Sequence, residues 1–333
     1  MLGNVTPQLS SVGFRVGRIW TRRMRLSIQT PQYGCELQDI LTVWRAADTL
    51  GFRSAWLMDH LVPIMLPDEE SMLEAWTAIS ALLAGTDSIR AGVLVSANTF
   101  RHPSLLARMA ATVDRLSGGR LEVGLGAAWC EREHQANGIH FPNVPTRLSM
   151  LDESAQMLRL LWTETEANFE GVHYQLRGAK CEPKPLQDPL PLLFGGRGER
   201  RTLRTVARWA NGWNGSGSVA MLAHSVSVLR DHCNAIGRDP NTITLTARND
   251  FIMSADTTRT TAHLERLAAF WGTTVEDARD RSWVGEKDQI VDWLLQLRAI
   301  GFDEAILGIE PPYEIGTVEM LTQVAEDLAP IVA

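Results

Sequence analysis

The sequence predicts an α/β protein whose parallel strands close into a TIM-like (β/α)8 barrel. From Met24 onward, about eight short apolar runs alternate with segments of helical periodicity, and nearly every run is followed by a helix. This alternation is typical of a parallel sheet, and eight repeats favour a closed barrel over an open doubly wound sheet. The chain has 333 residues, and barrels of this length fold as one domain, here expected at residues 24–333.

The first half of the barrel is expected from apolar runs that end at polar or glycine-containing joints. Gly51 and Gly85 stop the first two helices, and Pro103 suits the first turn of the third. In chain order we expect a strand at 24–30, a helix at 36–50, a strand at 54–59, a helix at 71–84, a strand at 89–98, a helix from Pro103, a strand at 121–128 and a helix at 146–162.

The second half continues the alternation. We expect a strand at 190–195, a helix at 199–210, a short strand at 212–217, a helix at 219–236, a strand at 243–253, helices around 260–270 and 288–300, a strand at 304–309 and a helix at 316–331. Insertions are expected after strand four, at 130–145, and after strand seven. A hairpin is expected after helix four, where residues 169–176 alternate around a glycine.

Composition and charge indicate which kinds of binding partner and which cellular compartment to expect. The net charge is −7 with both signs interspersed, which argues against nucleic acid and anionic membranes as partners. No apolar run approaches the roughly 20 residues that a membrane span requires. The four cysteines lie far apart without a C-x-x-C pair, so we expect a cytoplasmic protein with neither a disulfide framework nor a metal site.

Residues 1–23 differ from the rest of the chain. They contain four arginines and no acidic residue, and they show no secondary-structure period. Arg15 and Arg18 interrupt the apolar patch, so the hydrophobic region of a secretory signal is missing. An amphipathic, arginine-bearing leader is one interpretation. We expect instead a disordered or artefactual extension.

The second strand ends in a pair of residues suited to proton transfer. Asp59 and His60 stand at the carboxyl end of this strand, and that end of a barrel carries the active site. A carboxylate beside an imidazole can move protons, because histidine titrates near neutral pH. We interpret His60 as a catalytic acid or base held by Asp59. A hydrogen-bonded structural histidine is the alternative.

The third strand turns small and polar at its carboxyl end. Ser96 and Asn98 alternate onto one face of the strand. There they can hydrogen-bond a planar heterocycle, or they form an ordinary polar strand end that meets water.

A glycine-rich turn follows the fifth strand and opens a helix. Gly195, Gly196 and Gly198 leave bare amides at the helix start, and Arg197 adds a positive charge. Such turns bind anions, and barrels often bind phosphate at this position, although glycine pairs also form ordinary turns. The pattern is neither G-x-G-x-x-G nor a Walker loop, which excludes a nicotinamide-binding Rossmann site and an NTPase.

Several motifs follow one another between Met24 and Gly308. They are G-F-R-S-A-W-L-M-D-H (51–60), M-L-E-A-W (72–76), R-H-P (101–103), T-V-D-R-L-S-G-G-R (112–120), G-L-G-A-A-W (124–129), E-R-E (131–133) with G-I-H-F-P (138–142), and P-K-P (183–185) leading to F-G-G (194–196). In this order and spacing they resemble the luciferase-like monooxygenase superfamily, and within it the single-component oxidoreductases that use coenzyme F420, a deazaflavin.

The resemblance implies a site as well as a fold. It places F420 at the carboxyl-terminal face of the barrel, and it places a non-proline cis peptide, which makes a bulge against the ring, at Leu94–Val95. His60 falls near the ring. The resemblance also assigns contacts with the ring and ribityl chain to Ser96, Asn98, Ala127, Ala128 and Trp129, and contacts with the phosphate to Gly195, Gly196 and Arg197.

We therefore predict an oxidoreductase that transfers a hydride between F420 and a small organic substrate, and a homodimer, as in many relatives. Trp129 stands where the sugar-phosphate dehydrogenases of this group carry a catalytic glutamate, which argues against a sugar-phosphate substrate. Met65, Trp271 and Trp283 near the expected entrance suggest an apolar or aromatic one. The alternatives are a monooxygenase that uses reduced FMN and O2, and a non-catalytic flavin- or deazaflavin-binding protein.

Overall fold

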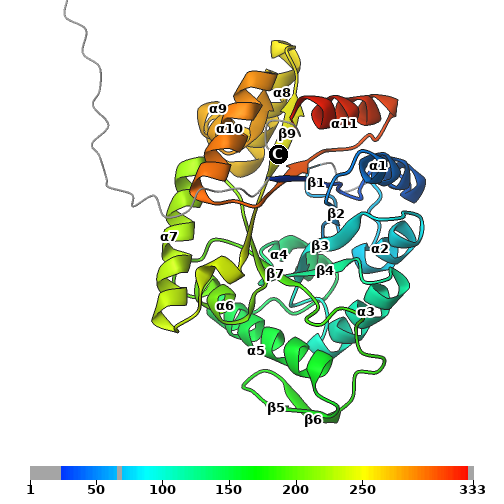
Figure 1. Cartoon of the computed structure of the whole chain (residues 1–333), viewed down its shortest axis with the longest axis vertical. Coiled ribbons are helices and arrows are strands. Elements are labelled where there is room, and N and C mark those ends of the chain that lie inside the picture. The colour runs from blue at the N-terminus through cyan, green and yellow to red at the C-terminus, as the bar shows by residue number, and fades with distance from the viewer. Residues whose placement is uncertain (1–23, 66–69, 329–333) are drawn as a thin grey trace, which may run out of the picture.

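A computed structural model describes residues 24–65 and 70–328, so the predicted extension at 1–23 lies outside the described residues. Eight parallel strands form a closed ring, because β9 pairs with β8 on one side and with β11 on the other, and β11 returns to β1. The predicted (β/α)8 barrel is thereby confirmed (Figure 1). Its strands are β1 (Arg25–Gln29), β2 (Ser54–Leu57), β3 (Arg90–Ala97), β4 (Leu121–Gly126), β7 (Leu192–Gly195), β8 (Gly212–Gly215), β9 (Thr244–Met253) and β11 (Glu304–Gly308).

Helices follow the barrel strands and cover the outside of the ring. They are α1 (Leu37–Thr49), α2 (Ala75–Ala84), α3 (Pro103–Leu116), α5 (Val144–Thr163), α6 (Thr202–Trp209), α7 (Val219–Ala235), α10 (Lys287–Ile300) and α11 (Ile315–Asp327), with a 3-10 turn at Pro240–Thr242 before β9. None of the helices in the described ranges is long and apolar enough to cross a membrane.

Additional elements interrupt the alternation at three places. The short helix α4 (Glu131–Ala136) lies between β4 and α5, and the antiparallel hairpin of β5 (Ala167–Glu170) and β6 (Gln175–Ala179) follows α5. Between β9 and α10 the chain forms α8 (Thr257–Trp271), α9 (Val275–Asp280) and β10 (Trp283–Gly285). Strand β10 pairs with the last residues of β9, beyond the ring, and Figure 1 shows α8 and α9 gathered at one end of the molecule.

Two helices begin three or four residues later than the sequence predicts. Helix α2 starts at Ala75 rather than residue 71, because the Glu74 side chain accepts hydrogen bonds from the backbone N–H groups of Trp76 and Thr77 and thereby caps the helix. Helix α6 starts at Thr202 rather than residue 199. The glycine-rich turn continues further, with Gly196 at a φ of 116°, so the pocket end of this segment is loop rather than helix.

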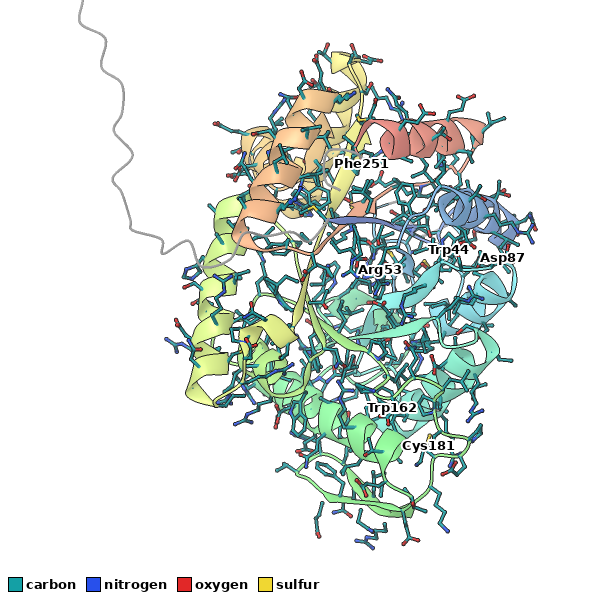
Figure 2. All side chains as sticks on the ribbon, viewed as in Figure 1. Trp44, Arg53, Asp87, Trp162, Cys181 and Phe251 are labelled. Atoms are coloured by element: carbon teal, nitrogen blue, oxygen red, sulfur yellow. The ribbon has the colours of Figure 1, made fainter. Side chains whose placement is uncertain are left out.

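The interior of the barrel changes from polar to apolar along its axis. At the amino ends of the strands, Glu122 accepts hydrogen bonds from Arg53 and Arg90, both at 2.6 Å, and Glu304 accepts them from serine hydroxyls of β1 and β2. Above this layer an apolar cluster that includes Trp56 fills the ring. Arg53, labelled in Figure 2, therefore lies in a buried ion network, whereas Trp44 and Trp162 belong to the main hydrophobic core formed with the surrounding helices.

Candidate active site

A pocket of about 820 Å³ opens at the carboxyl ends of the barrel strands, and residues at or just beyond the end of all eight strands line it. Parallel strands present their last residues to one face, so groups distant in sequence meet there. Of the residues predicted for the site, the pocket lining includes Asp59, His60, Leu94, Val95, Ala127, Ala128, Trp129, Gly195, Gly196 and Arg197.

Strand β3 carries a bulge that turns one side chain into this pocket. The peptide bond between Leu94 and Val95 is cis, at the position that the resemblance indicates. The pairing of β3 with β4 shifts its register between Val93 and Ser96, as expected for a bulge. Leu94, Val95 and Ala97 line the pocket as a result.

Three glycines make room for the Val95 side chain. A Cβ added to Gly124 or Gly195 would lie 3.0 Å from a Val95 methyl carbon, and one added to Gly126 would lie 2.5 Å away. The distance at Gly126 is shorter than real Cβ atoms show, and 3.0 Å is tighter than most such contacts, so the lack of a Cβ at these three glycines leaves room for Val95. A Cβ on Gly124 would also lie 2.2 Å from the Val93 carbonyl oxygen. These glycines therefore serve packing at this point rather than turn formation.

Gly126→Ala should destabilise the protein by about 1–3 kcal/mol, because the new methyl group overpacks the wall against Val95. In a Val95→Ala background the same change should cost much less, since the clashing methyl groups are gone. Urea denaturation of the two single variants and the double variant measures this coupling. Equal costs in both backgrounds would contradict the contact.

The predicted ligand role of Ser96 and Asn98 does not fit their position. The bulge shifts the strand's alternation, and both side chains point into the barrel wall instead of the pocket. Ser96 is fully buried and accepts a hydrogen bond from the indole N–H of Trp76 at 3.0 Å. Asn98 is 3% exposed and donates to the backbone carbonyl of Arg147 at 3.0 Å.

His60 is held by a residue that the sequence did not indicate. Its Nδ1 lies 2.9 Å from Oε1 of Glu133 on α4, and the second carboxylate oxygen accepts the N–H of Leu61 at 2.8 Å. A carboxylate only accepts hydrogen bonds, so Nδ1 of the neutral imidazole carries the proton and Nε2 keeps its lone pair. The Glu133 side chain is 2% exposed, and the pair lines the pocket.

The predicted contact between Asp59 and His60 is wrong. Both oxygens of Asp59 accept hydrogen bonds from the Arg101 guanidinium, at 2.7 and 2.9 Å, and one also accepts the N–H of Ala97 at 2.8 Å. Adjacent residues of an extended segment point in opposite directions, so sequence neighbours there rarely become partners. Asp59 instead anchors the segment that leads from β3 into α3.

The residues after β4 form the wall beside His60. Ala128 has a φ of 57°, which is uncommon for a residue with a side chain, and Trp129 follows it with 61% of its surface exposed. The Trp129 indole meets the His60 imidazole edge-on, with ring centroids 5.5 Å apart at 74°. An aromatic surface therefore borders the proton-carrying group.

Two arginines from different parts of the chain line the pocket. Arg197 belongs to the turn itself, and Arg281 follows α9 in the insertion after β9. Burial and the neighbouring positive charge of Arg281 lower the pKa of Arg197. Within the described part of the chain neither arginine forms an ion pair, so two like charges converge where backbone amides are also available. An anion satisfies both.

The remaining wall, from β1, β9 and β11, is charged but internally paired. Arg248 donates to the Gln29 side-chain oxygen at 2.6 Å and lies 3.1 Å from Asp250. The Gln29 amide in turn donates to the Leu94 carbonyl at 3.1 Å, which ties this wall to the bulge. Beyond β11, Glu310 forms an ion pair with an arginine of α8.

His263 on α8 should make stability pH-dependent. Burial, and then the charge of Arg266, lower the pKa of His263 from 6.5 to about 4, so the unfolded chain binds its proton first as pH falls. The free energy of unfolding should therefore drop by about 2 kcal/mol between about pH 7.5 and pH 5. His263→Gln should flatten this decline in urea titrations. Parallel curves for both proteins would contradict it.

A pocket at the carboxyl ends of a closed ring of parallel strands, lined by a histidine–carboxylate pair, is typical of an α/β-barrel enzyme. The sequence model of the family named luciferase-like monooxygenase matches residues 21–289. The chain belongs to this family.

Curated relatives include an uncharacterised protein of Mycobacterium tuberculosis, 32% identical over 210 residues that cover 59% of this chain and 73% of that one. An F420-dependent glucose-6-phosphate dehydrogenase of Amycolatopsis mediterranei is 29% identical over 197 residues, 58% of this chain and 56% of the relative. Pyrimidine monooxygenase RutA of Stutzerimonas stutzeri is 33% identical over 168 residues, which cover 49% of this chain and 46% of that relative.

Solved structures share the fold at low identity. An F420-dependent secondary alcohol dehydrogenase in complex with an F420-acetone adduct superposes with a TM-score of 0.83 at 19% identity, over 93% of this chain and 99% of that one. The coenzyme F420-dependent tetrahydromethanopterin reductase of Methanopyrus kandleri superposes with a TM-score of 0.78 at 17% identity, over 93% of this chain and 100% of that one.

Besides misplacing Ser96, Asn98 and Asp59, sequence reasoning missed two pocket residues and misplaced Trp283. Glu133 lies in the E-R-E motif, but a carboxylate 73 residues from its histidine gives no periodic signal. Arg281 lies in the insertion after β9, which the sequence indicated only as part of the entrance. Trp283, expected at the entrance, is 2% exposed within β10, whereas Met65 and Trp271 do line the pocket.

Proposed function

We propose that the protein transfers a hydride between coenzyme F420 and a small organic substrate. The observation that carries this proposal is that one pocket combines an anion site, a bulged wall and a proton-carrying histidine. A deazaflavin with a phosphate-bearing side chain needs all three. The relatives that use F420 support the same cofactor, and those that use FMN are why FMN is the alternative.

The described residues fit such a cofactor. Gly195, Gly196 and Arg197, with Arg281 opposite, would hold the phosphate, since they offer amides and two positive charges without an ion-pair partner in the described chain. Val95 would support the ring. Ala127, Ala128 and Trp129 follow β4 beside it and complete the ring's surroundings. F420 supplies a two-electron hydride carrier that, unlike FMN, does not form oxygen adducts.

His60 would move the proton that accompanies the hydride. In the oxidation of an alcohol, the C–H bond would deliver a hydride with its electron pair to the cofactor, and the O–H proton would pass to Nε2 of His60. Glu133 would orient the ring through Nδ1 and stabilise the imidazolium that forms. Reduction of a C=O or an activated C=C uses the same groups in the reverse direction.

A fluorescence titration with oxidised F420, and separately with FMN, tests the cofactor. We expect micromolar affinity for F420 and weak binding of FMN. Arg197→Ala should weaken F420 binding by about tenfold, as expected for a charge-assisted contact. The same variant should leave the affinity for the deazaflavin core without its phosphate unchanged.

The opposite results are equally informative. Tight FMN binding without an F420 signal would overturn the proposal and make oxygen consumption with reduced FMN the next assay. Binding of F420 without turnover of any alcohol, ketone or enone would favour the non-catalytic binding protein. His60→Ala would then leave the affinity for F420 unchanged, and there would be no activity to lose.

A further inference from the structure

Part of the pocket lining, here called the apolar side, consists of large hydrophobic side chains, whereas Arg197 and Arg281 add positive charge to the lining. Ten large hydrophobic side chains are strongly exposed in the described chain, and three of them, Trp129, Val144 and Phe270, line this one pocket. Isolated apolar residues on a surface are ordinary, but a group of them at the mouth of a pocket marks a binding surface.

Further apolar residues complete this side. Met65, in the loop after β2, and Trp271, at the end of α8, pack against the same small hydrophobic cluster and both line the pocket. Ile64 and Leu148 add to the lining. The loop that carries His60 and the insertion after β9 thus meet through apolar contacts, and the wall next to the proton-carrying group is hydrocarbon and indole.

The charges on this side are already paired. Arg147 donates its guanidinium hydrogen bonds to the backbone carbonyls of Ala127 and Pro142 and stacks on the Phe141 ring, with its Cζ 3.8 Å from the ring centroid. Further charged lining residues form ion pairs, which are Asp59 with Arg101, Asp250 with Arg248 and Glu310 with Arg266, and Glu133 accepts a hydrogen bond from His60.

Among the pocket-lining residues described, Arg147, Arg197 and Arg281 form no ion pair, and of these Arg197 and Arg281 belong to the proposed anion site. A phosphate or carboxylate on the substrate would therefore find Arg147 as the one further cation among the described lining residues, and this guanidinium already binds two carbonyls and a ring. Burying an uncompensated charge is strongly unfavourable. The two arginines are occupied once a phosphate-bearing cofactor is bound.

We propose, resting on the proposed function, that the substrate is an uncharged, largely apolar ketone or its alcohol. Its hydrocarbon part would pack on Trp129, Phe270 and Met65, with its oxygen at His60. In the reducing direction the carbonyl carbon accepts the hydride and its electron pair, and the oxygen accepts the proton of the imidazolium. Trp129 is the specificity-determining residue, because it contacts both the substrate and the proton carrier.

A homologous series of straight-chain 2-alkanones tests this class. Binding to the protein loaded with oxidised cofactor is measured by calorimetry, using F420 or, if only FMN binds, FMN. Affinity should rise about two- to fourfold for each added methylene until the wall is filled. Glucose 6-phosphate should bind at least tenfold more weakly than the longest ketone that fits.

Variants of Trp129 test whether the apolar side of the pocket causes the dependence of affinity on chain length. Trp129→Ala should abolish most of the dependence on chain length, and Trp129→Phe should retain it. Val172→Ala, in the hairpin and 86% exposed, is the matched control and should match the parent protein. Affinity that does not rise with chain length, or tighter binding of the sugar phosphate, would overturn the inference. Failure of F420 to bind would count against the proposed cofactor alone, since the series is read with whichever cofactor binds.

Discussion

His60→Ala should lower kcat by about 10²–10⁴-fold, the usual contribution of a positioned acid or base, while leaving the affinity for the deazaflavin unchanged. The reason is that His60 offers a lone pair at Nε2 to the pocket while Glu133 holds its other nitrogen. The comparison requires single-turnover rates of cofactor reduction or oxidation and a fluorescence titration of the same samples. A loss of cofactor affinity with an unchanged rate would show that His60 only packs against the ring.

Variants of Glu133 and Asp59 distinguish a carboxylate that orients His60 from one that only stabilises the fold. Glu133→Gln keeps the shape but removes the charge that stabilises the imidazolium, so it should reduce kcat and change the pH–rate profile. Asp59→Asn should instead lower thermal stability, because the Arg101 guanidinium loses one of its two ion pairs and keeps only the one with Glu74. If Asp59→Asn moved the pH–rate profile and Glu133→Gln did not, the partner assigned to His60 would be wrong.

Glu122→Gln should destabilise the fold by about 3 kcal/mol, the lower end of the cost of breaking a buried ion pair. Glu122 lies inside the barrel and accepts from both Arg53 and Arg90 at 2.6 Å. The lower end is expected because Arg53 also lies 3.8 Å from Glu304, and this second carboxylate still compensates part of the Arg53 charge in the variant. Equilibrium urea denaturation at neutral pH measures the difference, with the exposed Glu319→Gln as the control, which should change stability little.

The same residue should contribute to acid sensitivity. Burial opposes ionisation of Glu122, but Arg53 and Arg90 outweigh it and lower its pKa below the ordinary 4.5. Its stabilising contribution is therefore complete above about pH 4.5 and is lost as pH falls below that value. In Glu122→Gln this part of the acid-induced decline should disappear. An unchanged difference between the two proteins from pH 7 down to pH 3 would contradict it.

The barrel was predictable because its cause is local and repeated. The apolar runs around Ala55, Val93 and Val123 alternate with amphipathic helices, and such a pattern has few arrangements that bury every strand on both faces. Helix starts were less accurate. The cap at Glu74 and the loop geometry around Gly196 depend on backbone hydrogen bonds and torsion angles that periodicity does not encode.

The sequence by itself determined the eight-stranded barrel, the glycine-rich turn after the fifth strand and the placing of His60 at a strand end. Only the tertiary structure decided which groups face one another. Asp59 binds Arg101, 42 residues away, and leaves His60 to Glu133, 73 residues away, because the segments after β2, β3 and β4, although whole helices separate them in the chain, follow adjacent strands of the ring. The bulge reversed the alternation that Ser96 was expected to follow. Periodicity indicates which side of a strand is buried. Which side chains become hydrogen-bond partners across the barrel depends on ring closure, on strand register and on which charges compete for the same counter-ion.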